Sequence, residues 1–245
     1  LASTTDPTKG SALVGFLQAG TGAVGRTTQS KDRDLFSAYD FGVTGNGTTD
    51  DEAALAIADA ASVAAGAPLR LTHGTYKISS ALTFNSPLIF EAGAVLKPDA
   101  GITVTFAQNF TAPTSNQIFD ISNSGALISL PYNIPEVWGE WWGANGNYTK
   151  TDNEVPINQA ILAMEATVAG PTGVSFGLVR LGRGIFLVSG VINMKTGVIL
   201  RGSGRSYTEI LANSGTWSGT KMFDASTGAT PMFDCRLENM RINAA

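Results

Sequence analysis

Two neighbouring carboxylates, Asp50 and Asp51, are the first candidates for chemistry in this sequence. Glycoside hydrolysis uses two carboxylates that face each other across a sugar, but neighbours in a helix point in different directions. Thr49 and Glu52 have the spacing of a capping box, in which both side chains satisfy free backbone N–H groups at a helix start. We therefore predict structural caps here, formed by Thr49, Asp50, Asp51 and Glu52.

His73 is the only histidine, so a serine–histidine–aspartate triad would have to use it. It precedes Gly74 and aligns with Arg183 of a second, similar segment, and turns favour polar residues beside glycine. We interpret it as a polar turn residue. Cys235 is the only cysteine, which excludes an intrachain disulfide and a cysteine-based zinc site. We assign no catalytic, cofactor-binding or metal-binding residue.

Three tryptophans, Trp138, Trp141 and Trp142, stand beside Glu136 and Glu140. Aromatic rings can stack on sugars, and they also fill junctions and subunit contacts. Because this cluster begins a repeated unit, we favour packing or a contact within a trimer, with a sugar contact as the alternative.

Charged residues in the C-terminal part are weaker candidates. A glycine-containing turn, Gly202-Ser203-Gly204, lacks the Lys-Ser/Thr ending of a phosphate-binding loop. We therefore expect a turn with solvated arginines around it, namely Arg180, Arg183, Arg201 and Arg205. Three acids could share one face of the molecule, but catalysis needs a pair at a defined separation, so we do not assign them: Asp224, Asp234 and Glu238.

A cap-helix-strand unit that must position these residues occurs twice, at about residues 39–98 and 139–211. In the first copy, an alanine-rich helix over 51–65 ends at Gly66, which suits a left-handed C-cap. In the second, Thr151 and Glu154 repeat the capping-box spacing, and the helix ends at Gly170. Its apolar residues form one stripe: Ile157, Ile161, Met164 and Val168.

Short strand-like runs follow each predicted helix, separated by glycine and polar turn residues. They cover 69–71, 76–78, 82–84, 88–90, 94–96 and 102–106, then 179–181, 185–187, 191–192 and 198–200. Strands this short make a poor hairpin sheet, whereas even spacing favours a mainly β solenoid whose coils stack. Each helix would then be a plug that covers the apolar interior and the unpaired strand edge. Later runs at 222–223, 232–233 and 237–242 predict further coils that continue beyond Ala245.

The composition sets limits on partners. With 15% charged residues, a net charge of −4 and no basic cluster, nucleic-acid binding is not expected. No apolar run approaches the roughly 18 residues of a membrane span. Residues 1–36 are rich in glycine, threonine and serine and predict an extended arm with a brief helix or turn near its end, which packs on other elements or subunits.

The run Tyr39-Asp40-Phe41-Gly42, Gly45-Asn46-Gly47 and Thr49-Asp50-Asp51, followed by Gly74-Thr75-Tyr76, resembles the opening of the pectate-lyase-like superfamily. Its members are right-handed parallel β-helices, and phage tailspikes and capsule depolymerases are a large group among them. The preceding stretch from Ala19 to Lys31 is similar to the segment before the β-helix of many tailspikes. The second copy departs from the pattern, because Trp141 and Trp142 replace Asp40 and Phe41.

This resemblance implies a homotrimer in a virion, assembled in the host cytoplasm, that attaches through its arm to a tail or baseplate protein. It implies recognition and degradation of a bacterial surface polysaccharide, with the catalytic carboxylates on coils beyond this chain. The expected parts are an arm (1–36), a first cap-helix and β-helix unit (37–135) and a second one (136–245). Two alternatives stay open: a structural virion connector without activity, and a secreted bacterial lyase, hydrolase or epimerase.

Overall fold

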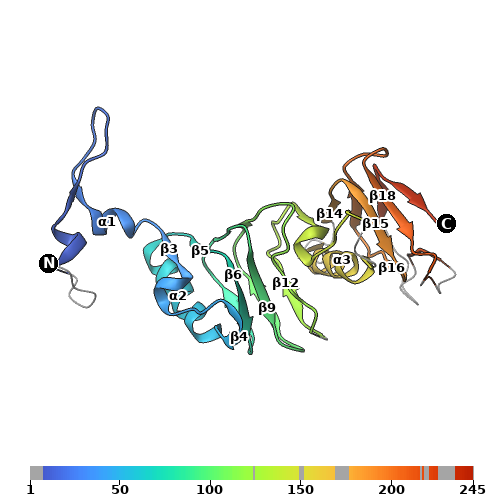
Figure 1. Cartoon of the computed structure of the whole chain (residues 1–245), viewed down its shortest axis with the longest axis horizontal. Coiled ribbons are helices and arrows are strands. Elements are labelled where there is room, and N and C mark those ends of the chain that lie inside the picture. Colours follow the sequence, from blue (N-terminus) through green and yellow to red (C-terminus); the bar gives the residue numbers. More distant parts are fainter. Residues whose placement is uncertain are drawn as a thin grey trace.

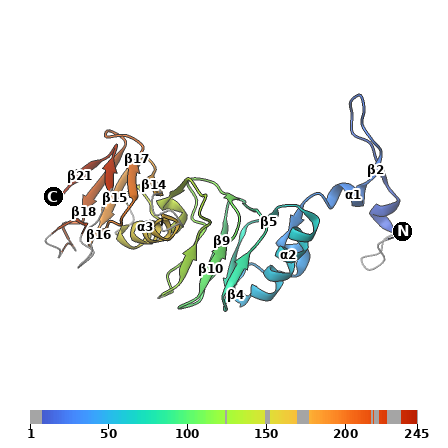
Figure 2. The same cartoon turned by 180° about the vertical axis from the view of Figure 1, so that it is seen from behind.

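The computed structural model describes residues 8–123, 125–148, 152–168, 177–215, 217, 221–225 and 235–244. The molecule is elongated, with a slender arm at the N-terminal end and two successive groups of short strands along the long axis (Figure 1, Figure 2). We call the group from Phe36 to Ser129 the first section and the group from Glu136 to Asn243 the second section. Among the described residues, no helix is long and apolar enough to cross a membrane.

The arm has little structure of its own. Its elements are η1 (Gly10–Leu13), β1 (Gly15–Phe16), β2 (Arg26–Thr27) and α1 (Thr28–Asp32). The two strands pair antiparallel, and α1 begins where the hydroxyl of Thr27 accepts a hydrogen bond from Ser30 N. The predicted extended arm with a short helix is therefore present. None of its described residues is buried; burial begins at Ala38.

The first section contains ten short strands, one longer helix and a 3₁₀ turn near its start. Its elements are β3 (Phe36–Ser37), η2 (Ala38–Phe41), β4 (Asn46–Asp50), α2 (Glu52–Ala65), β5 (Leu69–Leu71), β6 (Gly74–Ile78), β7 (Leu82–Phe84), β8 (Leu88–Phe90), β9 (Ala94–Pro98), β10 (Thr103–Phe106), β11 (Phe110–Thr111) and β12 (Leu127–Ser129). They form three sheets, ordered β3-β5-β8-β11, β4-β6-β9 and β7-β10-β12. Helix α2 packs on β5, β6 and β7, one strand from each sheet.

The second section repeats this arrangement. Its elements are β13 (Glu136–Trp138), η3 (Gly139–Trp142), α3 (Glu154–Val168), β14 (Gly177–Leu181), β15 (Gly184–Val188), β16 (Ile192–Asn193), β17 (Val198–Gly202), β18 (Thr208–Ala212), β19 (Phe223–Asp224), β20 (Arg236–Glu238) and β21 (Arg241–Asn243). The sheets are β13-β14-β17-β20, β15-β18-β21 and β16-β19. Helix α3 packs on β14, β16 and β17, and also on β12 of the first section.

Within each section, every strand pair among the described elements is parallel. Strands of these sections that follow one another in the chain do not pair, except β13 and β14, which lie on either side of α3; β5 pairs with β8, β6 with β9 and β7 with β10. The chain thus visits three sheets in turn and returns to the first. The protein is mainly β with several parallel sheets, as predicted, and the hairpin alternative is not seen there.

Alternate side chains of these strands point into a common interior. In β9, β14, β17 and β18 the first, third and fifth residues are buried. A cluster of aromatic rings lies in the interior of the first section. It is formed by Phe84, Phe90, Phe106, Phe110 and Phe119. Phe119 also contacts Trp142, with ring centroids 5.0 Å apart, so the two sections share one hydrophobic core.

The predicted helices are present, but the prediction of a capping box at the start of the first one is wrong. Helix α2 ends at Gly66, as predicted, with φ 65°. At its start, Asp51 is the N-cap residue and makes no side-chain cap bond, while Thr49 lies in β4 and its hydroxyl accepts from the Asn46 amide. Pairing of β4 with β6 keeps the backbone extended through Asp50, which leaves Thr49 outside the helix. Glu52 is simply the first helical residue.

Asp50 and Asp51 were predicted to be helix caps, but only the Asp50 side chain bonds to the helix start, and both carboxylates mainly hold neighbouring loops. The Asp50 carboxylate accepts hydrogen bonds from Ser79 and from Glu52 N; the hydrogen bond from the Ser79 hydroxyl lowers the pKa of Asp50 below its ordinary value. The buried Asp51 carboxylate accepts from Thr44 N at 2.7 Å, from the Thr44 hydroxyl and from Gly45 N.

The same hydrogen-bond pattern recurs in the second unit. Asn153 replaces Asp51: its Oδ1 accepts from Asn145 N, and its amide donates to Leu187 O. Asp152 replaces Asp50 and accepts from Glu154 N and Ser189 N. The two copies predicted from sequence are therefore structurally equivalent. Thr151 lies outside the described residues, as does Gly170.

We expect the substitution Asp51→Asn to destabilise the first section by about 1–3 kcal/mol. Both oxygens of the Asp51 carboxylate accept a hydrogen bond from a backbone N–H group. Asparagine has one oxygen and one NH₂ group, so one of these backbone donors would face another donor. Thermal unfolding followed by far-UV circular dichroism measures the loss. Asn153→Asp is the reciprocal variant, and it should lose the bond to Leu187 O. An unchanged midpoint for Asp51→Asn would contradict this account.

Candidate functional site

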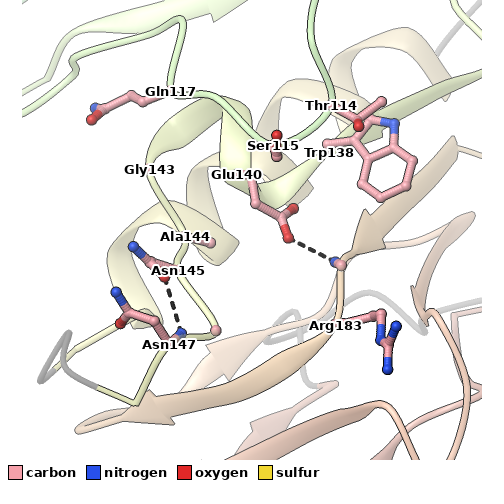
Figure 3. Close-up of a pocket in the computed structure, with 12 residues that line it drawn as sticks. Thr114, Ser115, Gln117, Trp138, Glu140, Gly143, Ala144, Asn145, Asn147 and Arg183 are labelled. Atoms are coloured by element: carbon pink, nitrogen blue, oxygen red, sulfur yellow. Dashed lines mark hydrogen bonds between the residues drawn. The ribbon is translucent and has the colours of Figure 1, made fainter.

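A polar pocket lies where the first section meets the second. It has a volume of about 420 Å³, and three separate segments form its walls. They are the loop 114–117 between β11 and β12, the segment 138–147 around η3, and the turn at Gly182 and Arg183 between β14 and β15. Figure 3 shows Glu140 in the middle of these walls, with Trp138 on one side and Asn145 and Asn147 on the other.

Glu140 has the most unusual environment of the lining residues. Its Oε1 accepts a hydrogen bond of 2.7 Å from Gly182 N (Figure 3). Its Oε2 is buried and has no hydrogen-bond partner. Burial raises the pKa of the Glu140 carboxyl above its ordinary value, because the charged form loses its hydration. A Cβ on Gly182 would lie 2.6 Å from Oε1, so a side chain there would displace the Glu140 carboxyl from its present position.

The equivalent place in the first unit is filled by a tyrosine. Tyr39 is the second residue of η2, as Glu140 is of η3, and its hydroxyl donates to His73 O at 2.9 Å. A Cβ on Gly74 would lie 2.7 Å from that hydroxyl, which shows how closely the ring covers the turn. In the second unit, the shorter Glu140 side chain leaves this space open, and the loop 114–117 of the first section forms its far wall.

The remaining walls offer an aromatic face and several amides. Trp138 is half-buried, and the Arg180 guanidinium lies 5.8 Å from its ring centre while pairing with Glu136. Gln117 donates to Phe119 O at 2.9 Å and lies against Gly143. Asn145 Oδ1 accepts from Asn147 N. Such walls suit binding of a polar ligand. Glu140 carries the single carboxyl group among the described lining residues, so these residues form no acid pair for hydrolysis.

Of the predicted tryptophans, only Trp138 reaches this pocket. Trp141 and Trp142 are buried, at 6% and 4% exposure, so a sugar or trimer contact through them is wrong and packing is what the structure shows. The Trp141 indole donates to Pro113 O. The reason is that η3 turns these two rings inward against Phe110 and Phe119.

The arginines and late acids are mostly engaged in pairs. Arg180 pairs with Glu136 and Arg201 with Glu238, so these two are not simply solvated, which corrects the prediction. Arg183 lies 4.6 Å from the centre of the Tyr207 ring. Asp224 pairs with Lys221 and belongs to another sheet than Glu238, so the structure does not bring these acids together. Asp234 lies outside the described residues.

His73 is exposed in the turn between β5 and β6, as predicted. In the described part of the chain, no group of three or more histidine, cysteine, aspartate or glutamate side chains could hold a metal ion. Sequence reasoning missed Gln117 and the pocket as a whole. One signal was present: in the alignment of the two units, Gly182 replaces Thr72 and Glu140 replaces Tyr39.

Comparison of the sequence with protein-family models and with curated proteins found no match.

We expect Glu140→Gln to weaken the pH dependence of stability. The folded pKa of Glu140 is raised, so the folded state holds this proton more tightly than the unfolded state. The wild type therefore loses stability as the pH rises from the unfolded pKa through the folded one. Glutamine keeps an acceptor for Gly182 N and cannot ionise. Urea unfolding from pH 4 to pH 8 should show a smaller decline for the variant; an equal decline in both proteins would contradict the assignment.

Proposed function

We propose that this chain is the N-terminal part of a bacteriophage tailspike, a receptor-binding protein that mounts a trimeric right-handed β-helix on the virion. The observation that carries the proposal is the cycling of the chain through three parallel sheets, twice, each time behind a helix unit. Stacked coils of this kind have one long axis and an apolar interior. Crossover connections between parallel strands are almost always right-handed, which supports the handedness.

Exposed apolar residues on the arm support an interaction between subunits or with a virion protein. Each is more than half exposed: Leu13, Val14, Leu17, Val24 and Leu35. Side chains of this kind on a segment without a core of its own mark a contact surface. In the proposed assembly, the arm contacts the other two subunits of a homotrimer and a tail or baseplate protein.

Bacterial surface polysaccharide is the proposed target, and the whole protein is proposed to degrade it. The connector without activity is the second candidate, favoured by the absence of a suitable acid pair among the pocket residues. Incubation of the full-length protein with host capsule or lipopolysaccharide separates the two. New reducing ends indicate hydrolysis, and unsaturated uronates indicate a lyase. If neither polymer is degraded, the result supports the connector without activity.

Deletion of residues 1–36 from the phage gene tests the virion role. We expect virions to lack the protein, and the shortened chain to lose its trimeric state in sedimentation experiments, because the exposed apolar residues of the arm would be gone. The matched control replaces Arg33, an exposed arm residue, by alanine. Normal incorporation of the shortened protein would contradict attachment through the arm, and absence of the full-length protein from virions would favour a secreted enzyme instead.

A further inference from the structure

We propose that the Glu140 pocket is a saccharide-binding site that accepts one neutral, hydroxyl-bearing sugar residue through Trp138, Glu140 and the surrounding amides. For the class of ligand, this inference rests on the proposed function. It places a binding site at the junction of the two sections.

The pocket has a suitable size and a suitable surface. Its volume of about 420 Å³ lies within the roughly 300–1,000 Å³ of small-molecule sites. Amide groups both donate and accept hydrogen bonds, as sugar hydroxyls do, and three of them line the walls: Gln117, Asn145 and Asn147. Thr114 and Ser115 add hydroxyl groups on the wall that belongs to the first section. Trp138 supplies an aromatic surface for the apolar face of a sugar ring.

The charges of the lining favour a neutral ligand. Among the described residues that line the pocket, Glu140 and Arg183 are the only ones with ionisable side chains. An anion would meet the Glu140 carboxyl, and the single arginine is held against the Tyr207 ring. A cation would meet Arg183. The buried Glu140 Oε2, which has no partner in the protein, is a group that a small shift of the side chain would bring to a ligand hydroxyl.

The comparison of the two units indicates that the pocket is a specific feature of the second copy. Both copies have the same turn, the same 3₁₀ helix and the same backbone hydrogen bonds: Thr75 N donates to Gly45 O, and Ile185 N donates to Gly146 O, both at 2.8 Å. The first copy closes the space with Tyr39. The second copy has a carboxyl group there and keeps Gly182 and Gly146 beside it. This provides a variant that fills the pocket with a residue the fold already accepts, Glu140→Tyr.

The test uses the whole chain and four probes in saturation-transfer NMR. Methyl glycosides of glucose, galactose and N-acetylglucosamine are the neutral probes, and glucuronate is the charged probe. We expect at least one neutral glycoside to bind. Trp138→Ala should weaken that binding about tenfold, and Glu140→Tyr should abolish it. Tyr39→Phe, at the equivalent place in the first unit, should leave it unchanged.

Far-UV circular dichroism verifies the folding of each variant. If Glu140→Tyr does not fold, the binding test rests on Trp138→Ala, because Trp138 is half-exposed and its loss should not disturb the core. Absence of binding by all three neutral glycosides, tighter binding of glucuronate, or equal binding by Trp138→Ala and the wild type would each overturn the inference. These outcomes are independent of virion incorporation. Failure of the arm-deletion test would leave a saccharide-binding chain without a virion role.

Discussion

The substitution Gly184→Ala is expected to destabilise the second section by about 2–6 kcal/mol. Gly184 has φ 137°, a conformation that side-chain-bearing residues rarely adopt, and strain of this kind costs about 1–3 kcal/mol. In addition, a Cβ at this position would overlap the carbonyl group of Gly146, a backbone atom that cannot move aside. Overpacking in such a place adds about 1–3 kcal/mol. The affected contact joins the first residue of β15 to the segment after η3.

Tryptophan fluorescence is the appropriate measurement, because all four tryptophans lie between positions 138 and 217, within the second section. The urea midpoint should fall sharply in the variant. Gly42→Ala is the matched control: φ is 88°, and its Cβ would meet open space. It should cost only the backbone strain, about 1–2 kcal/mol, measured by circular dichroism. Equal losses for the two variants would show that the overlap with Gly146 does not matter.

Phe119→Ala should cost about 3–5 kcal/mol and should separate the unfolding of the two sections. Phe119 is fully buried and lies within 6.1 Å of Phe90, Phe106 and Phe110, measured between ring centroids. Removal of such a ring leaves a cavity whose cost falls in this range. The residue also joins the sections, because its ring contacts Trp142 and its backbone N–H donates to Trp141 O at 2.9 Å.

Circular dichroism reports both sections, whereas tryptophan fluorescence reports the second section and its junction with the first. We expect the two signals to coincide on urea unfolding of the wild type and to separate in Phe119→Ala, as in an array whose neighbouring units are uncoupled. Phe36→Ala is the control, since Phe36 is only half-buried at the start of the first section. Coincident transitions in Phe119→Ala, or a loss below about 1 kcal/mol, would contradict the joining role.

The elements could be predicted from local sequence because each carries a local signal. Residues 69–71, 82–84 and 88–90 form strands with the predicted bounds, and α2 ends at the predicted glycine. The start of α2 was predicted wrongly because spacing alone does not reveal that β4 extends to Asp50 and pairs with β6. Side-chain hydrogen bonding of Thr49 to Asn46 then replaces the capping interaction.

The pocket could not be predicted, because its walls come from residues far apart in the sequence. Thr114 and Arg183 are brought together only by the stacking of one section on the other, and no local pattern gives that register. The ion pairs of Arg180 and Arg201 have the same origin: each partner lies on a neighbouring parallel strand. Knowledge of the pairing of β13, β14, β17 and β20 would have predicted both pairs.

The absence of burial in the described residues before Ala38 has a consequence for protein engineering. No side chain of residues 8–35 is buried in the interior of the first section, so the covalent connection near Leu35 can be cut and rejoined without disturbing that interior. A chimera that carries a foreign leader fused ahead of Phe36 should therefore fold with its sheets intact. Exchange at this junction would join one body to different N-terminal segments.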